Sequence, residues 1–257
     1  MNDSSGGGSV FVGAGTVVNV AAILAGSGIG LLVGNRLPAR TRAVVTDGLG
    51  LVTLLIAGLS VVAVTDRVLS DAVGPSAPVL IVLGAVIVGG VIGSLLRIEH
   101  RLESSGSWLQ ARLGGSGDAG ARAQFVEGFV TASLVFCVGP LAILGSITDG
   151  LGGGAEQLLL KSALDGFASI AFAASLGVGV MASAIAVAAI QGSLTVLGAV
   201  MGSFVPEAHV VALTATGGVL LVGVALRLLN IRPVAVGDML PALLVAPVLV
   251  QSIVWLR

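Results

Sequence analysis

Long apolar stretches, separated by short polar segments, run through almost the whole chain. Eight of them come close to the length of about 20 residues that an α-helix needs to cross a bilayer. The pattern therefore predicts an all-α polytopic membrane protein with eight transmembrane helices. The predicted spans are Val10–Val33, Ala43–Val64, Val79–Leu96, Phe125–Ile147, the two halves of Leu158–Val205 divided at Gly177–Gly179, Val210–Leu229 and Val234–Trp255.

The polar segments outside the spans differ in character. Residues 1–9 are rich in Gly and Ser, which predicts a disordered tail, and they lack the positive charge that starts a cleaved signal peptide. Residues 10–257 then form a single transmembrane domain. Apolar and charged residues alternate along Arg97–Leu113 as in a helix that lies on a membrane surface, and Gly114–Gly120 is typical of a flexible linker. We expect residues 97–121 to form a cytoplasmic interfacial segment.

The composition lies outside the range of soluble proteins. Hydrophobic residues make up 56% and charged residues 10% of the 257 residues, and the mean hydropathy is +1.10. Soluble domains contain about 25% charged residues. The net charge of −1 also lacks the basic footprint of a nucleic-acid-binding protein. We therefore expect the lipid bilayer as a partner and no nucleic acid.

The positive charges predict how the chain crosses the membrane. If the loop Arg36–Arg42 is cytoplasmic, nine of the 12 Lys and Arg residues lie on the cytoplasmic side. The other three, Arg67, Lys161 and Arg257, then lie outside. Cytoplasmic loops of membrane proteins carry the excess of positive charge. We therefore expect a multi-pass protein of the prokaryotic cytoplasmic (inner) membrane with both termini external.

Glycine and proline mark the expected packing surfaces and helix breaks. Glycines recur every four residues in several spans, and small residues at this spacing let transmembrane helices pack closely. Such faces would also allow a homo-oligomer. The expected packing glycines are Gly26, Gly30, Gly34, Gly89, Gly93, Gly198 and Gly202. Helix kinks or breaks are expected at Pro140, Pro241 and Pro247, because proline lacks the backbone donor of a helix.

Two parts of the chain resemble each other. The glycine pattern of residues 89–96 nearly repeats in residues 198–205, and four spans carry a polar residue directly before a glycine. These polar residues are Asp47, Glu127, Asp165 and Thr216. Spans 2–4 then match spans 5–7, and the odd offset of three helices makes the two copies cross the membrane in opposite directions. Many secondary transporters have such an inverted-topology repeat; the alternative is a chance match between glycine-rich apolar segments.

Ionisable residues inside the spans are the first candidates for function, because a charge in the bilayer is costly. Glu127 and Thr131 lie four residues apart on one helix face, and Asp165 and Ser169 repeat this spacing. One interpretation is a polar path through the helix bundle, in which the carboxylates bind a cation or a proton. In the other, each acid lies about one turn inside its helix, where the helix dipole stabilises it or a basic residue such as Lys161 pairs with it.

The remaining candidates carry weaker signals. Asn19 and Gln191 lie deep in their spans, where hydrogen bonding between helices is the commonest use of an amide. Asp47 has basic Arg42 nearby and is better explained as a helix-end residue. The full set of candidates for a transport path is Glu127, Asp165, Thr131, Ser169, Asn19, Gln191, Asp47 and Thr216. The histidines suggest no metal site, because neither has the further ligands that a metal needs.

The sequence carries no enzyme motif. It contains no His-Glu-x-x-His, no Gly-x-Ser-x-Gly and no phosphate-binding loop. We therefore expect neither an enzyme nor a bound cofactor. Two functions stay open: a secondary transporter or channel for a small solute or ion, and a non-transporting membrane scaffold or envelope-associated interaction protein.

Several longer motifs resemble the YqgA/YdfK-like family of prokaryotic membrane proteins. They include FVEGFVTASLVFCVGPLAILGSITDGL, KSALDGFASIAFAASLGVGV, LTATGGVLLVGVALRLLNI and the opening GTVVNVAAILAGSGIGLLVGNRLP. The resemblance extends from Gly13 to Val250, nearly the whole chain. It implies a multi-span membrane protein of a domain-of-unknown-function family, and it carries over no catalytic or binding residues.

Overall fold

The computed structural model describes residues 11–34, 36–113, 119–137, 140–201 and 206–256. These residues form helices and connecting turns, with no strand among them, which confirms the predicted all-α class. The helices are α1 (Ala14–Gly34), α2 (Ala39–Val61), the 3-10 helix η1 (Val62–Thr65), α3 (Arg67–Val73), α4 (Ala77–Leu96), α5 (Ile98–Leu113), α6 (Ala119–Cys137), α7 (Pro140–Gly150), α8 (Glu156–Leu176), α9 (Gly179–Met201), α10 (Glu207–Leu228), α11 (Val236–Met239) and α12 (Ala242–Leu256).

Seven helical segments of the described chain are long and apolar enough to cross a membrane. They are α1, α2 with η1, α4, α8, α9, α10, and α11 with α12. An eighth crossing results if α6 and α7, which are bent by 78° relative to each other, form one broken span. The chain is therefore a multi-pass membrane protein with seven spans by length and composition, or eight if the bent pair is one span.

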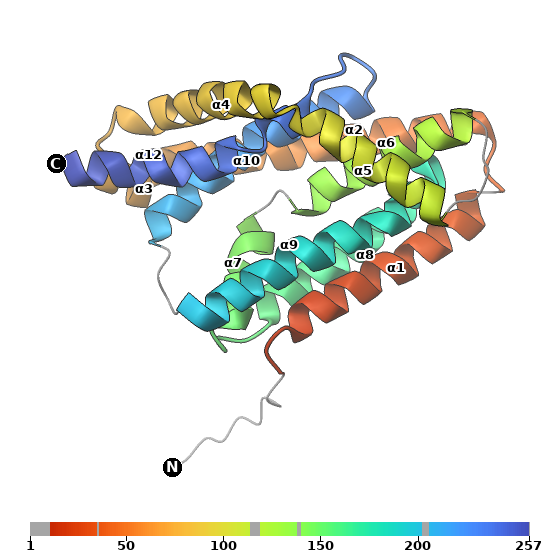
Figure 1. Ribbon diagram of the computed structural model, residues 1–257, viewed down its shortest axis with the longest axis horizontal. Coiled ribbons are helices and arrows are strands. Elements are labelled where there is room, and N and C mark those ends of the chain that lie inside the picture. The colour runs from red at the N-terminus through yellow and green to blue at the C-terminus, as the bar shows by residue number, and fades with distance from the viewer. Residues whose placement is uncertain (1–10, 35, 114–118, 138–139, 202–205, 257) are drawn as a thin grey trace, which may run out of the picture.

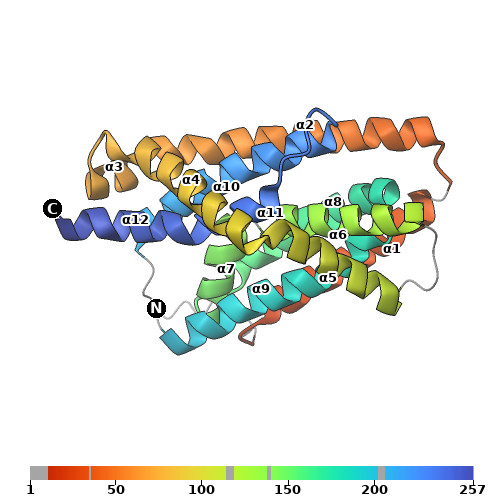
Figure 2. The same ribbon diagram turned by 45° about the horizontal axis from the view of Figure 1, so that its top comes forward.

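The helices form two groups that lie side by side (Figures 1 and 2). One group contains α1, α8 and α9 with α6 and α7, and the other contains α2, α4, α10 and α12. Helix α5 contacts α6 in the first group and α4 in the second, so it bridges the two. Helix α2 also contacts α8 across the interface between the groups.

Local sequence explains several helix ends. The Asp66 carboxylate accepts a hydrogen bond from the Val68 backbone N–H at 2.8 Å and so caps the start of α3. Arg97 has a left-handed conformation, with φ of 52°, which ends α4 and turns the chain into α5. Gly177, with φ of 80°, ends α8 and leads into α9.

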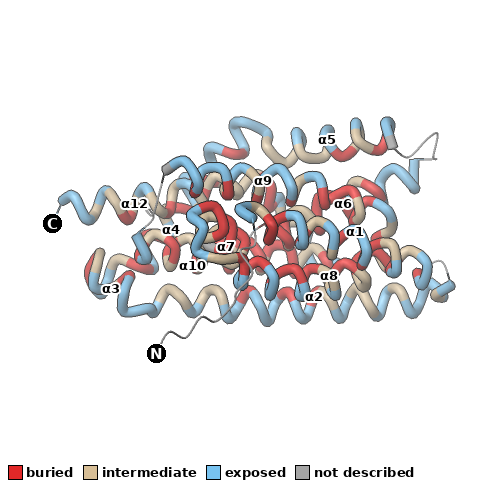
Figure 3. Tube along the Cα trace, turned by 90° about the horizontal axis from the view of Figure 1, so that it is seen from below, coloured by how far each residue is buried: buried red, intermediate tan, exposed pale blue. Residues whose placement is uncertain are grey.

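Buried residues gather toward the centre of the molecule (Figure 3). The exposed surface of the long helices carries many large apolar side chains. Large apolar side chains such as Leu32, Val91 and Val200 are exposed on the outside of long helices. Inside, Phe136 and Phe172 pack edge to face with ring centroids 5.9 Å apart. An apolar exterior on helices of this length is the surface that a lipid bilayer requires, because lipid offers no partner to polar groups.

Glycines let α1 and α8 touch along their backbones. A methyl group added to Gly34 would lie 2.5 Å from the carbonyl oxygen of Ala174, which is far inside contact distance. Gly26 and Gly30 face the α8 backbone in the same way. The four-residue spacing therefore forms one continuous packing face on α1.

The other expected packing glycines serve two further helix pairs. Gly89 of α4 lies against Ala242, the first residue of α12. Gly93 of α4 lies against Asp238 in α11. Gly198 of α9 lies against Ile147 of α7. The remaining candidate, Gly202, falls outside the described residues.

Of the three prolines expected to interrupt helices, two lie at helix boundaries. Pro140 is the first residue of α7, and Pro241 separates α11 from α12. Pro247 lies inside α12, which continues through it, so the helix does not break at this position. Transmembrane helices tolerate proline because neighbouring helices and small local adjustments satisfy the freed carbonyl.

The predicted orientation can be tested by labelling single cysteines from outside intact cells. We expect a membrane-impermeant thiol reagent to reach cysteines at positions 70 and 152 and not at positions 38 and 115, because positive loops stay cytoplasmic. The background should be low, because the native Cys137 is buried. The reverse labelling pattern would overturn the orientation drawn from the charges.

Candidate functional site

Three helices of the first group bring polar side chains together. Asn19 of α1 donates from Nδ2 to Asp165 Oδ2 of α8 at 3.0 Å and to Gln191 Oε1 of α9 at 3.2 Å. Asn19 and Gln191 are fully buried, and Asp165 is 8% exposed. Nine residues of α8 precede Asp165, which puts it about 14 Å from the helix start at 1.5 Å per residue. The contact therefore lies near the middle of a transmembrane helix.

Lys161 completes this group from the preceding turn of α8. Its Nζ forms an ion pair with Asp165 Oδ2, and the Lys161 residue is 5% exposed. A buried charge needs a partner of opposite sign, so each member of the pair stabilises the other in the membrane interior. We call Asn19, Lys161, Asp165 and Gln191 the polar cluster; its two charges cancel.

Further polar groups extend from the cluster along α1 and α9. Thr16 Oγ1 lies 3.3 Å from Thr195 Oγ1, within hydrogen-bond distance. Beyond them, the Asp149 carboxylate of α7 accepts hydrogen bonds from the Gly13 and Gly15 backbone N–H groups, both at 3.2 Å. Asp149 thereby caps the start of α1 from another helix, where the helix dipole favours a negative charge. Together these groups form a polar column from the start of α1 to the polar cluster.

Two atoms of the polar cluster have no hydrogen-bond partner within the described residues. They are the acceptor Asn19 Oδ1 and the donor Gln191 Nε2. Buried polar atoms are bonded to protein or ordered water in roughly nine cases of ten. A free acceptor and a free donor on two bonded amides therefore mark a place where water or a ligand can bind.

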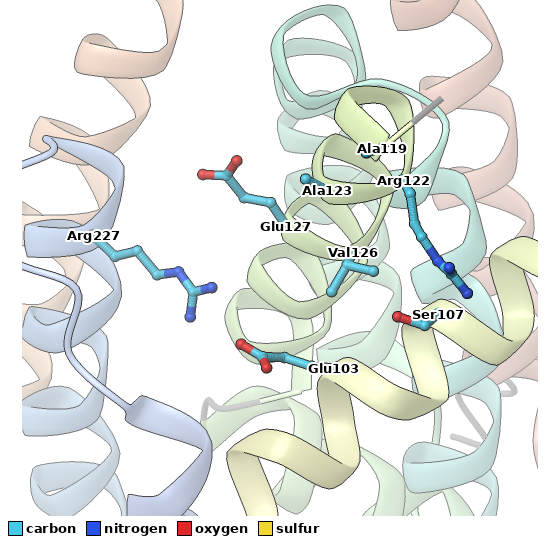
Figure 4. Close-up of a pocket in the computed structure, with 8 residues that line it drawn as sticks. All are labelled: Glu103, Ser107, Ala119, Arg122, Ala123, Val126, Glu127 and Arg227. Atoms are coloured by element: carbon cyan, nitrogen blue, oxygen red, sulfur yellow. The ribbon is translucent and has the colours of Figure 1, made fainter. Parts of the chain in front are cut away.

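Glu127 lies in a different place, an open cleft of about 600 Å³ between α5, α6 and α10 (Figure 4). Glu103 of α5 and Arg227 of α10 extend into the space between their helices, and Arg122 points toward Ser107. The cleft therefore presents carboxylates and guanidinium groups together. Such a mixed lining can bind polar or charged groups of either sign.

Arg227 also ties α10 to α5. Its Nη1 donates to Glu99 Oε1 at 2.7 Å, and Glu99 Oε2 accepts from the Gly237 backbone N–H at 2.6 Å. In return, Asp238 Oδ1 accepts from the Glu99 backbone N–H at 2.9 Å, which caps the start of α5. This network holds α5 in place as one wall of the cleft.

Glu127 and Asp165 lie further from the starts of their helices than the sequence predicts. Helix α6 begins at Ala119 and α8 at Glu156, so Glu127 and Asp165 each follow more than two helical turns. The interpretation that they lie one turn from a helix start is therefore wrong. For Glu127 it failed because residues 119–124 extend α6 before the apolar stretch that starts at Phe125. Asp165 already lies seven residues after Leu158, where its predicted span starts. Lys161 is buried inside α8 and therefore does not count as an external loop charge.

Of the eight transport-path candidates, three are hydrogen-bonded to one another: Asn19, Asp165 and Gln191. Within the described residues, no hydrogen bond connects the other five candidates to these three. Ser169 is buried and donates to the Gly166 carbonyl oxygen at 2.8 Å. Thr216 is buried and donates to the backbone carbonyl one turn earlier in α10, also at 2.8 Å. Thr131 is buried in α6, and Asp47 is exposed on α2.

Thr16, Thr195 and Asp149 belong to the site but were not among the sequence candidates. Thr16 precedes Asn19 by three residues and Thr195 follows Gln191 by four, so helical periodicity alone could have found them. Asp149 has no such signal, because its role depends on where α7 ends relative to α1. Among the described residues, no three His, Cys, Asp or Glu side chains come together in a group that could hold a metal ion.

Comparison with known proteins identifies the family. A family model described as Protein of unknown function (DUF554) matches residues 14–251. The chain is 30% identical over 232 residues to the Uncharacterized protein YqgA of Escherichia coli (strain K12), across 90% of this chain and 94% of that protein. It is 28% identical over 236 residues to the Uncharacterized membrane protein YdfK of Bacillus subtilis (strain 168), across 92% of this chain and 95% of that protein.

No solved structure matches the chain. The family match covers nearly all of the described helices, from the first residue of α1 into α12. It agrees with the resemblance that the sequence motifs predict. With its multi-pass helical fold, the chain belongs to the DUF554 family of proteins.

Proposed function

We propose that this protein is a secondary transporter or channel that moves a small solute or ion across the membrane. The observation that carries the proposal is the polar cluster, an ion pair with two amides buried near the middle of transmembrane helices. Polar and charged groups at this depth are costly and typically mark a path for a substrate or an ion. Because the cluster is buried here, transport requires the helices around it to separate.

Two features support a route through the protein. The polar column starts at the beginning of α1, on the side that the charge pattern predicts to be external. The cleft around Glu127 lies beside the first half of α6, on the predicted cytoplasmic side. We assign Asp165 to the centre of the route and Glu127 to its cytoplasmic mouth.

Taken as one broken span, the bent pair of α6 and α7 supports the same proposal. Discontinuous helices near a polar centre are typical of secondary transporters, where the break exposes backbone groups to a protein-lined cavity. The end of α7 contributes Asp149 to the polar column, which links the broken span to the route. The inverted repeat of spans 2–4 and 5–7, the inner-membrane location and the external termini remain parts of the proposal, as does the absence of an enzymatic step.

A non-transporting scaffold would have a different interior. Its acids would lie at the two membrane interfaces, and its centre would be dry and packed by glycines. The α1–α8 contact does have such a glycine face, but Asp165 lies in the interior and bonds Asn19 there. This contact favours transport over a scaffold.

Flux through purified protein in liposomes tests the proposal. We expect Asp165→Asn to lower the flux of the transported species by about tenfold or more, since it removes a charge-assisted hydrogen bond at the centre of the route. Glu127→Gln should lower it less, because Glu127 lies in an open cleft. Asp47→Asn is the matched control, since Asp47 is exposed on α2. Unchanged flux in both folded variants at Asp165 and Glu127 would remove these carboxylates from the mechanism.

A further inference from the structure

The ion pair determines which way the amides of the polar cluster point. An ionised Asp165 only accepts hydrogen bonds, so Asn19 must present its NH₂ group to it. The second N–H of that group then donates to Gln191 Oε1. The chain of bonds leaves one acceptor, Asn19 Oδ1, and one donor, Gln191 Nε2, for an occupant.

Covalent geometry and the bond between the two amides limit how far apart these two free atoms can lie. The oxygen and nitrogen of one amide are about 2.2 Å apart. The bond between the two amides is 3.2 Å, so Asn19 Oδ1 and Gln191 Nε2 are no more than about 7.6 Å apart by covalent geometry. A carboxamide both donates and accepts, and its own oxygen and nitrogen are about 2.2 Å apart, so it can span this distance with two hydrogen bonds of about 3 Å.

The charges of the cluster disfavour an ion as the occupant. Lys161 and Asp165 neutralise each other. A cation would meet the ammonium of Lys161 and the NH₂ of Gln191, and an anion would meet the carboxylate of Asp165. Neither ion would find an uncompensated counter-charge in this cluster, and an unpaired charge in the membrane interior is costly.

An apolar groove between α1, α6 and α9 begins at Val20, the residue after Asn19, and at Ala188, about one turn before Gln191. Thr16 pairs with Thr195 and Asn19 with Gln191, so α1 and α9 run antiparallel here, and the next turns meet at the groove. The groove has a volume of about 470 Å³. Its lining residues are Val20, Leu24, Phe125, Val178, Met181, Ala182, Ala184, Ile185 and Ala188.

We propose that the site takes a small uncharged molecule with a carboxamide end, which bonds Asn19 and Gln191, and an apolar body, which lies in the groove between α1, α6 and α9. This inference rests on the proposed function and names its substrate class. Uncharged ends match the neutral cluster, and an apolar body matches the apolar lining of the groove.

Primary amides of increasing length, with their carboxylates as charged isosteres, test the inference. Acetamide, propionamide and butyramide should raise the melting temperature of the purified full-length protein, and acetate, propionate and butyrate should not. The apparent affinity should rise about fourfold with each added CH₂, which is the value expected for burying one methylene. An acyl chain of lipid or detergent that already fills the groove would remove this length dependence and overturn the proposal.

Three variants separate the two halves of the site. Gln191→Leu should abolish the amide response. Ala188→Leu should remove the dependence on length but keep the response to acetamide, because Ala188 lines only the groove. Ser193→Ala is the matched control, since Ser193 is exposed on α9 and donates to its own helix backbone. Equal responses of the wild type and Gln191→Leu would overturn the assignment of the amide pair.

Flux in liposomes distinguishes failure of this inference from failure of the proposed function. Amide flux that depends on Asp165 and Gln191 supports both. If Na⁺, K⁺ or Cl⁻ flux depends on Asp165 and no amide binds or is transported, the proposal of an uncharged substrate fails and the proposal of a transporter or channel stands. Amide binding without flux of any solute keeps the ligand class and overturns transport.

Discussion

Replacing Lys161 by Met is expected to lower the free energy of unfolding by about 3–5 kcal/mol, the usual cost of breaking a buried ion pair. The variant leaves the Asp165 carboxylate buried near the middle of α8 without its counter-charge. Asn19 still donates one hydrogen bond to it, but a single amide does not replace an ammonium. The measurement is unfolding of the purified protein in mixed micelles titrated with a denaturing detergent.

The double variant makes this prediction specific to the pair. Lys161→Met with Asp165→Leu should recover most of the loss, because an apolar pair of similar volume leaves no buried charge. It should still fail in the flux assay, because the carboxylate is gone. Arg67→Met is the control for loss of a cation, since Arg67 is exposed at the start of α3. A stability loss in the double variant equal to the sum of the two single losses would show that the pair is not coupled.

Replacing Gly30 by Ala is expected to destabilise the protein by about 3 kcal/mol, at the upper end for overpacking. The added methyl group would meet the backbone carbonyl of Ile170 and would lie 2.9 Å from Ala173 Cβ. A backbone carbonyl inside a helix cannot rotate away as a side chain can. The two helices would have to separate, and Asn19 and Asp165 lie on this same pair of helices.

Gly58→Ala in α2 is the matched control for that variant. No atom lies within 4 Å of the methyl group that it would add. The intrinsic preference of alanine for helix makes a gain of up to about 1 kcal/mol the expected result. The same unfolding assay measures both variants. Equal stability of Gly30→Ala and Gly58→Ala would show that close backbone contact does not hold α1 against α8.

The fold class could be predicted because bilayer thickness requires apolar stretches of nearly constant length. The break at Pro241 was also foreseeable, because proline removes a backbone donor at a known position. The continuation of α12 through Pro247 was not, since it depends on what the neighbouring helices supply to the freed carbonyl. The start of α6 could not be predicted, because residues 119–124 carry little apolar signal.

The site was predicted only in part, for a related reason. Asn19, Asp165 and Gln191 stood out because polar side chains are rare in apolar spans. Nothing in the sequence showed that these three meet while Glu127 lies in a separate cleft, because this depends on which helices pack together. The four-residue spacing of Lys161 and Asp165 did allow their pairing to be foreseen.

The partners of Asn19 have a consequence for synthesis of the chain. Asp165 and Gln191 follow Asn19 by 146 and 172 residues, so the first span is made long before the side chains that satisfy its amide. At translation rates of about 5–20 residues per second, α1 waits roughly 7–30 s for Asp165. During that interval the Asn19 amide must be accommodated by the insertion machinery, by water or by lipid headgroups. Assembly of α1 into the bundle is therefore a late event, although α1 is the first helix to be synthesised.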